Sequence, residues 1–96
     1  MDIHSLLEDK REEIEALAAQ YGVRKLRVFG SAARGDTTSA SDIDFLVDLE
    51  PGRSVMDLGG LLMGLQDLLG CDVDVVTERS LRPRIREKVL NEARPL

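Results

Sequence analysis

Residues 28–47 read VFGSAARGDTTSASDIDFLV, and this stretch decides how the chain is interpreted. It begins as an apolar strand and breaks at Gly30 and Ser31. After a polar loop it enters a second apolar strand, which carries Asp42 and Asp44. Strand residues two apart point the same way, with their roots roughly 6.5 Å apart. The two carboxylates can therefore share a hard divalent cation.

The aspartate pair also has a plainer interpretation, because charged strand residues usually form a solvated face. However, Asp is disfavoured in strands, and two like charges on one face repel each other. Asp42 and Asp44 also follow a Gly-Ser turn element. We therefore predict a metal site, since Mg²⁺ prefers a few carboxylates together with water and phosphate oxygens. Two ions about 3.5–4 Å apart could be bridged there.

Gly30 and Ser31 are candidates for a phosphate grip. A glycine at a strand end allows the backbone to approach a ligand closely. A serine hydroxyl and the N–H groups of a following helix can hold a phosphate. A Gly-Ser pair alone indicates only a turn, and the aspartates eleven residues later give it weight. Arg34 would add positive charge near the phosphates or brace the loop against an aspartate, and both alternatives stay open.

A third carboxylate is needed to deprotonate an attacking hydroxyl or to complete the coordination of a metal. The segment CDVDVVT offers Asp72 and Asp74, which point the same way. We favour Asp74, because it lies within the apolar run, whereas Asp72 is nearer the strand end and fits a solvated flank.

Apolar periodicity predicts an α/β fold with a small three- to four-stranded mixed sheet, helices mainly on one face, in the order α-β-α-β-α-β-α. Residues 1–96 are expected to form a single domain. The expected helices are 3–21, 32–34, 54–69 and 81–93, and the expected strands are 25–29, 42–49 and 71–77. Ser54 is predicted to cap the third helix, Gly70 to end it and Pro83 to open the last one.

The composition excludes several classes of protein. The net charge of −5 opposes non-specific nucleic-acid binding and suits a basic protein partner better than a polynucleotide. A single cysteine and a single histidine exclude an intramolecular disulfide and fall short of a structural zinc site. No segment predicts a signal peptide or a transmembrane helix, so a cytoplasmic location is expected. One cationic run, residues 79–86, fits a solvated helix, although it is also the first candidate for contact with ATP or a partner.

The motifs together resemble the signature of the DNA polymerase beta-like nucleotidyltransferase superfamily. Gly30-Ser31 is followed by Arg34-Gly35 and then by Ser41-Asp42-Ile43-Asp44. The short length and the VDVVT strand are similar to the minimal nucleotidyltransferase branch, and the resemblance covers nearly the whole chain.

This resemblance implies a Mg²⁺-dependent nucleotidyltransferase that uses ATP. Gly30 and Ser31 would bind the triphosphate, and Asp42 and Asp44 would hold two Mg²⁺ ions. Asp74 would be the third carboxylate, which helps a metal and accepts the proton of the acceptor hydroxyl.

The resemblance also implies a partner, a HEPN-domain toxin from an adjacent gene, for which this chain would be the antitoxin. AMP would be transferred to a tyrosine of that partner, as in type VII-like HEPN/MNT modules. A non-catalytic antitoxin that acts by binding alone is the main alternative. Nucleotidylation of a small molecule, with a partner subunit completing the pocket, is a further one.

Overall fold

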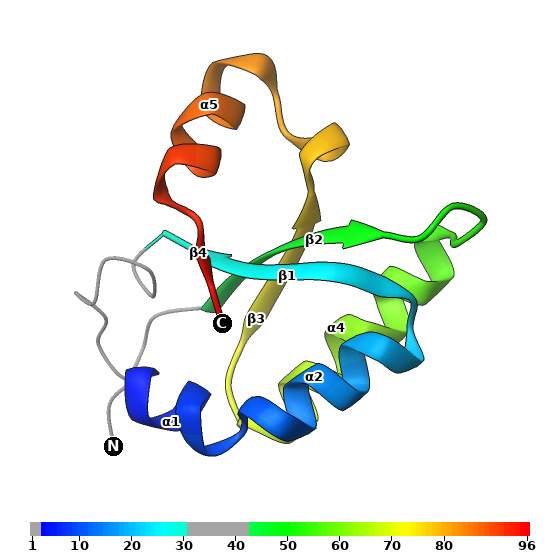
Figure 1. The fold of residues 1–96 in the computed structure, drawn as a ribbon, viewed down its shortest axis with the longest axis vertical. Helices are drawn as coiled ribbons and strands as arrows, with labels where there is room; N and C mark the ends of the chain where they lie inside the picture. Colours follow the sequence, from blue (N-terminus) through cyan, green and yellow to red (C-terminus); the bar gives the residue numbers. More distant parts are fainter. Residues whose placement is uncertain (1–2, 31–42) are drawn as a thin grey trace.

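A four-stranded mixed sheet organises the chain (Figure 1). The computed structural model describes residues 3–30 and 43–96. The strand order is β3-β2-β1-β4, with β2 and β3 parallel and the other neighbours antiparallel. The strands are β1 (Val23–Phe29), β2 (Ile43–Leu49), β3 (Val73–Thr77) and the short β4 (Arg94–Pro95). The α/β class and the mixed sheet predicted from the sequence are confirmed.

Among the described residues, three helices cover one face of the sheet and one helix covers the other (Figure 1). The first group is α1 (Ile3–Asp9), α2 (Arg11–Gln20) and α4 (Val55–Leu69), and the helix on the opposite face is α5 (Pro83–Glu92). A 3₁₀ turn, η1 (Glu78–Ser80), joins β3 to α5. No helix in the described parts of the chain is long and apolar enough to cross a membrane. The expected short helix 32–34 lies outside the described residues.

The alternation of β2 divides the core in two. Ile43, Phe45 and Val47 are buried in the main cluster, together with Ile14 of α2 and residues of α4. Leu46 points to the other face, where a smaller cluster holds the buried residues Leu46, Leu81 and Val89. The predicted alternation is therefore correct from Ile43 onward, and it places Asp44 on the same face as α5.

The signals that begin and end α4 behave as the sequence predicted. The Ser54 hydroxyl accepts a hydrogen bond from the Met56 N–H (3.2 Å), and the Asp57 carboxylate accepts one from the Ser54 N–H (2.9 Å). Gly70 ends the helix in the left-handed region, with φ of 69°. Pro83 lies in the first turn of α5, also as expected.

The first helix differs from the prediction, because α1 and α2 are separate helices rather than one. The backbone at Lys10 departs from helical values, with φ −100° and ψ 5°. The charged run 8–13 contains no apolar residue to continue a buried stripe across this point. The break lets Leu7 and Ile14, on either side of that run, both be buried in the main core.

Two glycines of α4, Gly60 and Gly64, face α2. A Cβ on Gly60 would lie 2.5 Å from the Tyr21 ring, and one on Gly64 would lie 2.8 Å from Leu17. These two glycines therefore set the close approach of α4 to α2, whereas Gly59 has open space around it.

Candidate active site

Asp44 and Asp74 are register partners on the parallel strands β2 and β3. Neighbouring strands are about 4.8 Å apart, and partners at one level point to the same face. Both aspartates therefore lie side by side on the α5 face of the sheet. Asp44 is half-buried and Asp74 is exposed.

Phe29 and Gly30 approach Asp44 from its other side. Phe29, the last residue of β1, is the antiparallel partner of Asp44. Gly30 follows with φ of 69°, a conformation that L side chains rarely adopt. A Cβ at Gly30 would lie 2.6 Å from Asp44 Oδ2. The glycine is thus required both by its conformation and by the nearness of the carboxylate.

The other predicted site residues, Ser31, Arg34 and Asp42, lie outside the described residues. Asp72 lies just before the first residue of β3. The register between β2 and β3 begins at Ile43 and Val73, and the Ile43 N–H donates to the backbone oxygen of Asp72 (3.2 Å). Asp74, rather than Asp72, is therefore the residue placed beside Asp44.

The residues present fit a hard divalent cation. Two carboxylates at neighbouring positions on one face offer the oxygen ligands that Mg²⁺ prefers. A Cβ at position 30 would press on the Asp44 carboxylate, so a glycine here lets the end of β1 lie close to that carboxylate. Within residues 3–30 and 43–96 there is no group of three carboxylate, histidine or cysteine side chains that could hold a metal. A further oxygen ligand would come from Asp42, a substrate phosphate or a partner.

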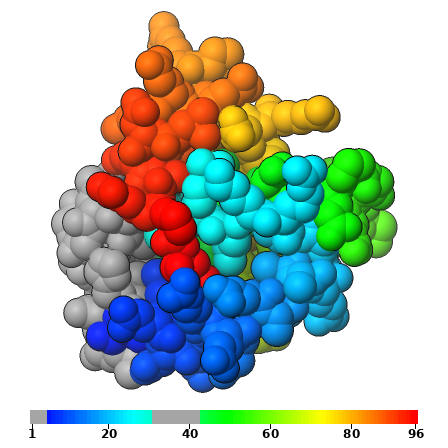
Figure 2. Space-filling model, in the orientation of Figure 1, coloured from blue at the N-terminus to red at the C-terminus, as the bar shows by residue number. Residues whose placement is uncertain are grey.

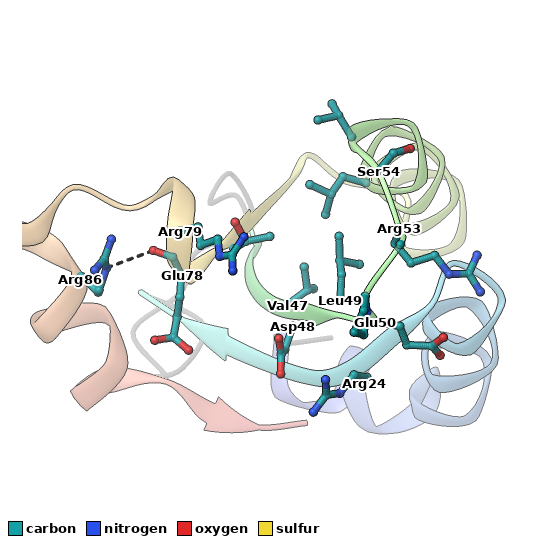
Figure 3. A pocket seen from close by; sticks show the side chains of 15 residues that line it. Arg24, Val47, Asp48, Leu49, Glu50, Arg53, Ser54, Glu78, Arg79 and Arg86 are labelled. Carbon is teal, nitrogen blue, oxygen red and sulfur yellow. Dashed lines mark hydrogen bonds between the residues drawn. The ribbon is translucent and has the colours of Figure 1, made fainter.

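A cleft of about 1000 Å³ opens at the opposite end of the strands (Figure 3). Asp44 and Asp74 do not line it. Asp48, which does, lies four residues after Asp44 on β2, a distance of about 13 Å. The cleft is bordered by charged side chains of both signs from several elements, namely Arg24, Asp48, Glu50, Arg53, Glu78, Arg79 and Arg86.

The sequence did not reveal this cleft as a site, because its walls come from segments far apart in the chain. The one available signal was the cationic run 79–86, of which Arg79 and Arg86 belong to the wall. Metal-assisted phosphoryl chemistry uses neighbouring carboxylates beside a turn that can approach a ligand. Among the described residues, Asp44, Asp74 and Gly30 have this arrangement, which makes the carboxylate pair, rather than the cleft, the candidate site.

Comparison with known proteins supports a nucleotidyl-transfer fold. A family model described as a nucleotidyltransferase domain matches residues 10–96. The protein adenylyltransferase MntA of Thermococcus cleftensis is 40% identical over 91 residues, which cover 95% of this chain and 89% of that protein. A solved structure of a candidate minimal nucleotidyltransferase has a TM-score of 0.88 at 48% identity and covers 100% of this chain and 97% of that one. A crystal structure of a toxin–antitoxin MntA–HpeT mutant has a TM-score of 0.72 at 26% identity, covering 90% of this chain and 70% of that one.

The chain belongs to the nucleotidyltransferase domain family, and within it to the minimal, MntA-like group. It is an enzyme of the nucleotidyltransferase class. The resemblance inferred from the Gly-Ser and Asp-x-Asp motifs is thereby confirmed.

Proposed function

We propose that this chain transfers AMP from ATP to a hydroxyl group of a partner protein with the help of Mg²⁺. The observation that carries the proposal is the register pairing of Asp44 with Asp74, with Gly30 closed against Asp44. It is supported by the similarity to MntA, which is named a protein adenylyltransferase.

Different residues of the chain would bind the triphosphate and hold the metal. The turn at Gly30 and Ser31 would hold the triphosphate through backbone N–H groups and the serine hydroxyl. Asp42, Asp44 and Asp74 would hold Mg²⁺, which when bound supplies positive charge at the phosphate oxygens. Arg34 would lie against the phosphates or brace the loop.

Asp74 is the candidate general base. It is exposed at the edge of the carboxylate pair, where an acceptor can reach it. The acceptor O–H would lose its proton to the Asp74 carboxylate, and the oxygen would form a bond to the α-phosphorus. The bond from that phosphorus to the oxygen bridging it to the β-phosphate would break, and pyrophosphate would leave with the electron pair.

The partner that we propose is a HEPN-domain toxin encoded next to this chain, with a tyrosine as the acceptor. The similarity to an MntA–HpeT toxin–antitoxin structure supports a toxin partner. That similarity equally supports the second candidate function, in which the chain neutralises the toxin by binding alone.

The test uses the purified chain, Mg²⁺ and the product of the neighbouring gene. ATP labelled at the α-phosphate should label the partner, and ATP labelled at the γ-phosphate should not. Peptide mapping should place the label on tyrosine. Label from the γ-phosphate would indicate a kinase. No label from either position, combined with neutralisation by an Asp44→Ala, Asp74→Ala variant in cells, would establish the binding function instead.

A further inference from the structure

Charge is segregated along this chain. Residues 78–94 contain six Arg and Lys against three Glu, a net charge of +3, while the remaining residues carry seven basic and fifteen acidic side chains, a net charge of −8. The basic part comprises η1 and α5, the helix that stands on the opposite side of the sheet from α1, α2 and α4 (Figure 1). An acidic body therefore carries one basic projection.

The outward-facing cations of this projection form a basic ridge, which we define as Arg79, Arg82, Arg84 and Lys88. All four are exposed. Arg84 and Lys88 lie one turn apart on α5, on the same side of the helix. Ile85 lies beside them and is 47% exposed.

The ridge cations differ from the inner arginine of the same helix. Arg86 donates from Nε to the Glu78 backbone oxygen and from an Nη to that of Leu81, both at 3.1 Å, and so braces the turn into α5. The ridge residues have no ion pair with any part of the chain that the structure describes. Their charge is therefore not used to hold this fold together.

Arg27 of β1 is a further cation on the α5 face of the sheet, and its hydrogen bonding is incomplete within the described residues. The Arg27 side chain is only 15% exposed, and its ion pair with Glu78 is long, at 4.0 Å. Its Nε is buried and has no hydrogen-bond partner within the described residues. Positive charge thus extends from the ridge toward the sheet, where Arg79 and Arg86 form part of the cleft wall (Figure 3).

The ridge is accessible to a large partner. The residues of α5 project from the body of the molecule in Figure 2. The helix packs on the sheet through a buried cluster, Leu46, Leu81 and Val89, with four partly buried residues around it, Phe29, Val76, Leu90 and Ala93. Its basic outer surface therefore faces solvent at a prominent point of the molecule.

We propose that the basic ridge and Ile85 form a docking surface for an acidic segment of the acceptor protein. A short segment with carboxylates and one apolar side chain would match both the cations and Ile85. A polynucleotide would suit the surface less well, because its continuous phosphates would meet Glu87 on α5 and the net charge of −8 carried by the rest of the chain. Complementary charge of this kind chiefly raises the association rate and selects the partner.

The position of the ridge fits this role. Arg79 lies beyond the C-terminal end of β3, whereas Asp74 lies near its N-terminal end. A partner held at the ridge would leave the carboxylate pair open for ATP and for the acceptor hydroxyl. The inference rests on the proposed function for the identity of the partner, although binding can be measured separately from AMP transfer.

The test compares two charge-matched variants. Arg84→Glu with Lys88→Glu changes the ridge. Lys10→Glu with Arg11→Glu makes the same change in net charge between α1 and α2, on the opposite side of the sheet. Association with the neighbouring gene's product is measured by surface plasmon resonance at low and moderate salt, in an Asp44→Ala background that prevents transfer. The same proteins are titrated with a fluorescent peptide of Glu and Leu and with a single-stranded RNA of similar length.

The ridge variant should bind the neighbouring protein and the peptide about tenfold or more weakly, chiefly through a slower association rate, and the control should remain within about twofold. Salt should weaken the wild type more than the ridge variant. Equal binding by ridge variant and control, tighter binding of RNA than of peptide, or no binding of either acidic probe by the wild type would overturn the inference. Ridge-dependent binding without AMP transfer would refute the proposed function and leave this surface standing.

Discussion

Asp44 and Asp74 are direct register partners across the parallel strands β2 and β3, although thirty residues separate them in the chain. The pairing places two carboxylates on one face of the sheet, and Gly30 closes against the first of them. The pairing therefore brings residues from distant segments of the chain together at one site, whose properties can be measured.

Replacing Gly30 by alanine should damage the site beyond its effect on stability. The left-handed conformation alone costs an alanine about 1–2 kcal/mol, and the new Cβ would also press on Asp44 Oδ2 at 2.6 Å. Gly70→Ala is a matched control, because Gly70 has the same φ of 69° and no neighbour within 4 Å. Both variants should lose similar stability in urea unfolding, and only Gly30→Ala should also lose AMP transfer and ATP binding. Equal activity of the two variants would show that the contact with Asp44 is unimportant.

Asp72 and Asp74, the two carboxylates of the CDVDVVT segment, should differ clearly in their effect on the rate of AMP transfer. Asp74→Asn should slow AMP transfer by about 10²–10⁴, the usual contribution of a general base. Asp72→Asn should stay within a few-fold of wild type, because Asp72 precedes β3, whereas Asp74 is the register partner of Asp44. Both side chains are exposed, so the melting temperatures should hardly change. The reverse order of the two rates would assign the role to Asp72.

Metal should bind beside Asp44 and Asp74, not at the end of the sheet where the cleft opens. Mn²⁺, added with a non-hydrolysable ATP analogue, should broaden the amide NMR signals of Ile43, Asp44 and Asp74. The signals of Asp48 and Glu78, which line the cleft, should broaden much less. Asp44→Ala should abolish the selective broadening. Broadening centred on the cleft residues would move the metal site to the other end of the strands.

The packing of α4 on α2 predicts that alanine at Gly59 and alanine at Gly60 change the stability of the protein in opposite directions. Gly60→Ala should destabilise the protein by about 1–3 kcal/mol, because its Cβ would lie 2.5 Å from the Tyr21 ring. Gly59→Ala should instead stabilise the helix by up to about 1 kcal/mol, since nothing lies within 4 Å of its added Cβ. Chemical denaturation of the two variants measures both effects. A stabilised Gly60→Ala would mean that α2 can move away without cost.

Local signals in the sequence predicted much of this fold. The alternation from Ile43 to Val47 depends on side chains within one strand, and the caps at Ser54 and Gly70 depend on one helix. The residues placed at the site, Asp44, Asp74 and Gly30, follow from the same kind of local reasoning.

Features that depend on contacts between distant segments were not predictable in this way. The register that places Asp74 directly opposite Asp44 is set by the packing of β2 on β3. The break at Lys10 reflects how Leu7 and Ile14 reach one core. The need for a glycine at position 60 is evident only once Tyr21 is known to lie opposite it. The cleft combines residues of β1, β2, the turn after β2 and η1, and no local pattern indicates such an assembly.

The central claim is that Asp44 and Asp74 act as one site for AMP transfer. The most direct measurement is the rate of transfer from α-labelled ATP to the neighbouring gene's product by wild type, Asp44→Asn, Asp74→Asn and the double variant. Residues that act as a unit show strongly non-additive losses. Each single variant should therefore lose at least about 10² in rate, and the double variant should be little slower than the slower single one. Losses that multiply in the double variant, or a single variant with wild-type rate, would contradict the claim.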